Sequence, residues 1–134
     1  MTQSKKRVFE QDKSEYTFRT IKSLINSIKF NKDIFSKIDV RFFLIDHKSK
    51  KEDLIIIKKI IKESLIKHKI IELNVSKYPQ IKTLNKNNPK IENNMKATMA
   101  SILTSFEIAR ENSNDLIYFV EDDYIHKKES LAEM

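Results

Sequence analysis

Three consecutive acids, Glu121, Asp122 and Asp123, directly follow the apolar run at residues 116–120. Adjacent carboxylates repel one another, and a divalent cation relieves that repulsion. Mg²⁺ and Mn²⁺ bind carboxylate oxygens together with phosphate. Because alternate side chains of an extended segment face opposite ways, we expect Glu121 and Asp123 to hold the cation while Asp122 braces the loop. The alternative is a solvated acidic turn that caps a final helix.

The elements that must position these acids alternate along the chain. Apolar residues at helical spacing predict helices at 15–29, from a Ser49 cap to about His68, and at 94–112. Short runs rich in β-branched and aromatic residues predict strands at 40–45, 70–75 and 116–120. The proline-containing segment 76–93 is expected to be a loop.

Strands that alternate with helices pair in parallel, so the predicted fold class is α/β, an open and mostly parallel sheet with flanking helices. Ligands of such sheets bind beyond the carboxyl ends of the strands. Asp46 follows one predicted strand and the acidic triplet follows another. We therefore expect Asp46 and the acids to meet at one edge of the sheet.

Length and composition limit the alternatives. The 134 residues, 40% of them hydrophobic, fit a single domain, expected to span 1–134. The absence of cysteine excludes disulfides, cysteine-ligated metals and thiol catalysis. The absence of glycine excludes the glycine-rich phosphate loops and the nucleophile elbow, whose backbones need glycine.

The charge of +7 comes from lysines spread over much of the chain. Lysines between 48 and 69 are expected to form the solvated face of a helix, and no nucleic-acid partner is expected, because aromatic residues are not interleaved with them. No run approaches the roughly 20 apolar residues that a membrane span needs, and the first residues do not form a secretion signal. The expected location is the cytoplasm, with peripheral association at the inner face of the membrane left open.

Three further residues have two interpretations each. His126 follows Asp123 by three positions and could assist a metal or phosphate, although a surface histidine is the favoured interpretation. Met95 and Met99 share a helical face and are expected to belong to the core rather than to a cofactor site.

Three segments of the chain resemble the N-terminal, nucleotide-binding half of GT-A glycosyltransferases, similar to family 2 enzymes. EYTFRTIKSLINSI at 15–28 resembles the first helix of the family, and FLIDHKS at 43–49 resembles the strand end that usually reads V-D-D-G-S. The predicted helix at 94–112, followed by DLIYFVEDDY at 115–124, resembles the helix and strand that lead to the D-x-D-type motif. The resemblance implies a Rossmann-like half of a GT-A fold over about residues 7–134.

The resemblance also implies a role for each matching residue. Asp123, with Glu121, would bind Mn²⁺ or Mg²⁺ that bridges the diphosphate of a sugar nucleotide, and Asp122 would face the ribose or sugar of the donor. Asp46 would contact the nucleobase. The residues that would help to hold the nucleotide are Arg7, Val8 and Phe9. Lys96, expected near the start of its helix, would reach the diphosphate.

The implied function is metal-dependent transfer of a hexosyl group from a nucleotide-diphosphate sugar to a glycan or lipid-linked acceptor. The chain departs from the family at His47-Lys48, where D-G is usual, and in its first strand, which residues 6–9 barely represent. The acceptor-binding half and the catalytic base have no counterpart, so we expect a partial domain that turns over no substrate. The alternative is a non-catalytic α/β module that binds nucleotides or proteins.

Overall fold

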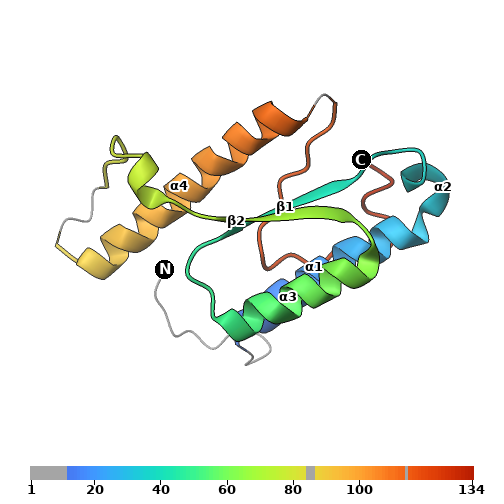
Figure 1. Cartoon of the computed structure of the whole chain (residues 1–134), viewed down its shortest axis with the longest axis horizontal. Coiled ribbons are helices and arrows are strands. Elements are labelled where there is room, and N and C mark those ends of the chain that lie inside the picture. Colours follow the sequence, from blue (N-terminus) through green and yellow to red (C-terminus); the bar gives the residue numbers. More distant parts are fainter. Residues whose placement is uncertain (1–11, 84–86, 114) are drawn as a thin grey trace. The chain divides into compact units, whose positions relative to one another are not determined.

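The computed structural model describes residues 12–83, 87–113 and 115–134 of a mixed α/β protein (Figure 1). Its elements are α1 (Lys13–Phe30), α2 (Lys32–Phe35), β1 (Arg41–Asp46), α3 (Lys51–Ser64), β2 (Lys67–Glu72), the 3₁₀ turn η1 (Val75–Lys77) and α4 (Pro89–Asn112). None of the helices in these ranges is both long enough and apolar enough to cross a membrane.

The chain divides into two compact units. The α1 unit comprises the described residues 12–42, 49–69 and 120–134, and the α4 unit comprises 43–48, 70–83, 87–113 and 115–119. The predicted single domain spanning 1–134 stays a prediction.

The described sheet consists of β1 and β2, which are parallel, with α3 as the connection between them. Asp39 lies just before β1 and accepts hydrogen bonds from Arg41 Nη2 at 2.6 Å and from Lys67 Nζ at 2.8 Å. The hydrogen bond from Lys67 lowers the pKa of Asp39 most, and the hydrogen bond from Arg41 lowers it further. One exposed carboxylate thus joins the beginnings of the two strands.

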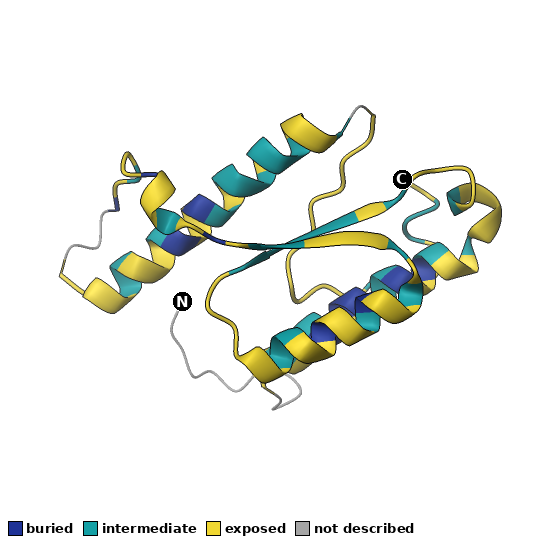
Figure 2. Cartoon of the chain, viewed as in Figure 1, coloured by how far each residue is buried: buried dark blue, intermediate teal, exposed yellow. Residues whose placement is uncertain are grey.

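The core of the α1 unit lies between α1 and α3, which run side by side (Figure 1). Ile21 and Ile25 on α1, and Ile57 and Ile61 on α3, are spaced four residues apart and are buried, as is Phe18 (Figure 2). Residues at this spacing lie on one face of a helix. The two buried faces therefore confirm the helical pattern that the sequence predicted for this part of the chain.

The core of the α4 unit forms around Leu73, Tyr78, Ala97 and Ala100. The Tyr78 hydroxyl lies 2.8 Å from Thr104 Oγ1 and donates to Glu107 Oε2 at the same distance. Small alanines on α4 let η1 and the loop after it pack closely against the helix.

Helix α4 begins at Pro89, within the segment predicted to be a loop, so that part of the loop prediction was wrong. Proline suits the first position of a helix because its missing N–H would have no partner there. The side chain of Asn88 caps the helix by accepting hydrogen bonds from the N–H groups of Lys90, at 3.1 Å, and Ile91, at 3.3 Å. Together, Asn88 and Pro89 explain where the helix starts.

Residues 116–120 form no strand with any other described part of the chain, so the predicted third strand was wrong. Leu116 is 80% exposed and Phe119 is 49% exposed, although Phe119 packs edge-on against Phe106 at 5.2 Å between ring centroids. With two strands in its described part, the sheet is not the Rossmann-like arrangement that was expected. The coarser assignment, α/β with parallel strands, holds.

The methionine stripe on α4 does not lie in a core as predicted. Met95, Met99, Ile102 and Phe106 are all exposed, whereas Ala97 and Ala100 are buried. The short alanine side chains, rather than the longer methionines, face the packed loop. Apolar spacing located the helix but did not show which of its faces would be covered.

Replacing Ile61 by alanine tests the packing between α1 and α3. Ile61 is fully buried, so the Ile61→Ala substitution is expected to lower the free energy of unfolding by about 2–5 kcal/mol. Urea denaturation followed by circular dichroism measures this change. Ile55 lies on the same helix but is 66% exposed, so Ile55→Ala serves as the control and is expected to change stability by less than about 0.5 kcal/mol. Equal losses in the two variants would contradict the packing.

The end of α3 offers a second test of stability. Leu65 follows the helix with φ of 62°, a left-handed conformation that costs a non-glycine residue roughly 1 kcal/mol. Its side chain is 92% exposed and contributes little to packing. Leu65→Gly is therefore expected to raise the melting temperature, whereas Lys59→Gly, inside the same helix, is expected to lower it. A lower melting temperature for Leu65→Gly would contradict the assigned conformation.

Candidate functional site

The acidic triplet lies in the α1 unit, where Asp122 and Asp123 form a turn and all three acids are exposed. The Asp122 carboxylate accepts a hydrogen bond from Thr17 Oγ1 at 3.3 Å and lies 3.4 Å from Lys13 Nζ. Both partners come from the first turns of α1. Asp122 thus ties the turn to the beginning of this helix.

Glu121 and Asp123 remain as the exposed acids on either side of Asp122. In the described ranges, no group of three or more histidine, aspartate or glutamate side chains is close enough to hold a metal ion. A site made from these two acids would therefore need water or the phosphates of a ligand to complete the shell of a cation, as is common for Mg²⁺. The metal roles of Glu121 and Asp123 stay predictions.

The segment after the acids follows α1 toward its C-terminal end. The Ser23 hydroxyl accepts a hydrogen bond from the His126 N–H at 3.0 Å. The carbonyl oxygen of Lys128 accepts hydrogen bonds from Ser27 Oγ at 2.8 Å and from Asn31 Nδ2 at 2.7 Å. Residues 122–131, called the C-terminal segment below, are therefore held by polar side chains that recur along one side of α1.

His126 is partly buried in this arrangement. Its Nδ1 lies 3.4 Å from Ser23 Oγ, and burial lowers the pKa of the imidazole because the charged form loses solvation. The neutral imidazole is favoured in the folded protein. His126 has intermediate exposure, so its interpretation as a surface histidine stays a prediction.

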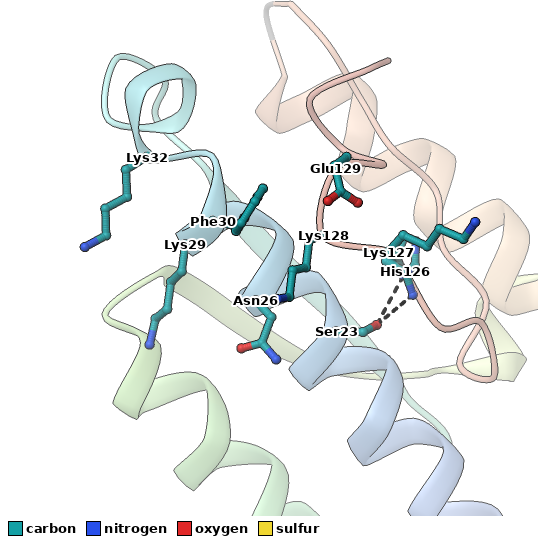
Figure 3. Close-up of a pocket in the computed structure, with 9 residues that line it drawn as sticks. All are labelled: Ser23, Asn26, Lys29, Phe30, Lys32, His126, Lys127, Lys128 and Glu129. Carbon is teal, nitrogen blue, oxygen red and sulfur yellow. Dashed lines mark hydrogen bonds between the residues drawn. The ribbon is translucent and has the colours of Figure 1, made fainter.

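An open pocket of about 760 Å³ lies between the C-terminal end of α1, the start of α2 and the C-terminal segment (Figure 3). All of these elements belong to the α1 unit. Its polar lining includes Ser23, Asn26 and His126, and its aromatic residue is Phe30. The charged residues that line it are Lys29, Lys32, Lys127, Lys128 and Glu129. Positive charge therefore predominates around this pocket.

The other predicted site residues lie elsewhere. Asp46 ends β1 in the α4 unit, and its carbonyl oxygen accepts a hydrogen bond from the Leu73 N–H at 2.7 Å. Lys96, in the same unit, is paired with Glu92 at 2.8 Å. Because α4 begins at Pro89, Lys96 lies beyond the first turn, where the dipole of the helix acts on anions. The nucleotide roles of Asp46 and Lys96, and the meeting of Asp46 with the acids, stay predictions.

The predicted nucleotide contacts Arg7, Val8 and Phe9 lie outside the described residues.

Sequence reasoning missed the polar side of α1. It used the apolar spacing of this helix and gave no role to Thr17, Ser23, Ser27 or Asn31. The last three of these are four residues apart, which places them on one face of a helix. Small polar residues at that spacing opposite an apolar face were the signal that a hydrogen-bonded segment covers the helix.

No protein-family model matches the chain, and none of the curated proteins or solved structures compared with it matches either. The resemblance to glycosyltransferases therefore depends on the three quoted segments alone.

The burial of His126 predicts a dependence of stability on pH. The folded state holds the pKa of His126 below the ordinary value of 6.5, so the unfolded state binds the proton more readily. The free energy of unfolding is therefore expected to fall as the pH falls through 6.5, and to level off below the lowered pKa. Urea denaturation between pH 7.5 and 5 measures this slope.

A substitution identifies the histidine that is responsible for this slope. His126→Asn is expected to flatten it. A slope that persists in His126→Asn would show that another group causes it.

Proposed function

We propose that the chain binds a nucleotide-diphosphate sugar together with a divalent cation, as the donor-binding part of a glycosyltransferase of the GT-A type. The observation that carries the proposal is that Asp122 contacts Thr17 and Lys13 at the beginning of α1. These contacts fix the turn and leave Glu121 and Asp123 exposed on either side. In this proposal β1, α3 and β2 are the β-α-β unit of the nucleotide-binding half.

The residues present suit Mn²⁺ or Mg²⁺. Glu121 and Asp123 offer oxygen ligands of the kind that these hard cations bind, and neither acid has an ion pair within the described part of the chain. A bound cation would offset the charge that develops on the diphosphate when the sugar is transferred. Asp122 would then act by positioning the turn, through Lys13 and Thr17, rather than by contacting the donor as the resemblance implies.

Thermal denaturation tests the proposal. Mn²⁺ with uridine diphosphate, supplied at about ten times the dissociation constant, is expected to raise the melting temperature by roughly 5 °C. Asp123→Asn and Glu121→Gln are each expected to abolish the part of this rise that depends on Mn²⁺, because each removes one charged oxygen ligand from the cation. Asp115→Asn, which removes an exposed aspartate of the α4 unit, is the matched control and is expected to keep the full rise.

Two results would contradict the proposal. One is a melting temperature that no nucleoside diphosphate changes in the presence of Mn²⁺ or Mg²⁺. The other is an equal rise in wild type and in Asp123→Asn, which would place the cation elsewhere. Transfer of a labelled sugar by the purified chain would support the donor assignment and would contradict the expectation that it turns over no substrate.

A further inference from the structure

We propose that the pocket at the C-terminal end of α1 is a binding site for the di- or triphosphate group of a small molecule. The site differs in its residues from the acidic turn and requires no cation. Its lining comes from α1, from α2 and from the C-terminal segment, as Figure 3 shows. Phosphate is the ligand class that the charges and hydrogen-bonding groups of this pocket fit.

Charge is the first argument. Four lysines, Lys29, Lys32, Lys127 and Lys128, line the pocket with a single acid, Glu129. Among the described residues, none of the four lysines has a carboxylate partner within ion-pair distance, whereas Lys13, Lys67, Lys77 and Lys96 each have one. The dipole of α1 places a partial negative charge of about half an elementary charge at its C-terminus, and the four lysines outweigh it. An anion with several charges would gain the most from this surplus.

The fixed position of the C-terminal segment is the second argument. The carbonyl oxygen of Lys128 is held by Ser27 and Asn31, and the N–H of Leu131 lies 3.4 Å from Ser27 Oγ. Ser27 is fully buried, so its own two contacts are shielded from water. The backbone that carries Lys127 and Lys128 is therefore in place before a ligand arrives, which reduces the entropy cost of binding.

The side chains at the pocket supply the third argument. Lys128 Nζ lies 5.6 Å from the centre of the Phe30 ring, which positions its ammonium group over an aromatic face. Asn26 adds an amide that can donate hydrogen bonds. Lys29, Lys32 and Lys127 extend outward in Figure 3, so a polyphosphate would draw these side chains inward over the pocket.

Isothermal titration calorimetry with pyrophosphate, in a chelator that removes divalent cations, tests the site. Binding to wild type is expected, and the double variant Lys127→Gln with Lys128→Gln is expected to weaken it at least tenfold. The matched control replaces Lys58 and Lys59 by glutamine, which makes the same change in charge. These two lysines are consecutive in α3, are exposed and do not line the pocket. The control is expected to bind within twofold of wild type. Circular dichroism establishes that both double variants are folded.

Further ligands show whether the site binds nucleotides or the phosphate group alone, and whether it prefers pyrophosphate to other anions. Adenosine and uridine diphosphates that bind more tightly than pyrophosphate would assign the site to nucleotides, and equal binding would assign it to the phosphate group alone. Either result supports the proposal. Sulfate that binds as tightly as pyrophosphate, equal weakening in the control variant, or no binding by wild type would overturn it.

The same assay distinguishes phosphate binding in the pocket from cation binding at the acidic turn. Asp123→Asn is expected to bind pyrophosphate like wild type in the chelator while losing the part of the response to uridine diphosphate that depends on Mn²⁺. A loss of pyrophosphate binding in Asp123→Asn would instead contradict the claim that the pocket needs no cation.

Discussion

The buried Ser27 hydroxyl is the contact on which the arrangement of the α1 unit depends. It donates to the Lys128 carbonyl and lies within hydrogen-bonding distance of the Leu131 N–H, so it satisfies two backbone groups of a segment that has no helix or strand of its own. A backbone without regular structure must find such partners when it packs against a helix. Without this hydroxyl, the Leu131 N–H would lose the acceptor that the structure gives it.

The polar contacts that anchor the C-terminal segment also arrange its charges along α1. Asp122 lies at the beginning of the helix, beside Lys13 and Thr17, whereas Lys127 and Lys128 line the pocket at its end. Negative charge near the first turn and positive charge near the last turn both suit the dipole of the helix. The acidic turn and the basic pocket are thus two consequences of one packed segment, although they would bind ligands of opposite charge.

Local sequence predicted the helices and the parallel pairing of β1 with β2, but not that residues 116–120 lie outside the described sheet. The spacing of Ile21, Ile25, Ile57 and Ile61 determines both the existence of α1 and α3 and the faces that they bury. The run at 116–120 has the composition of a strand, but a strand also needs a neighbour with unpaired backbone groups, and no local pattern specifies that neighbour. The pocket could not be predicted for a similar reason, since its two halves lie about a hundred residues apart in the sequence.

The exposed run at 116–120 has a consequence for handling the protein. Its five residues are apolar, β-prone and free of charge and proline, and their composition is that of segments that stack into fibrils. Asp115 and Glu121 flank the run directly and repel a second copy of it, as charged gatekeepers do. The repulsion between these flanking charges therefore limits how readily two copies of the run pair with each other.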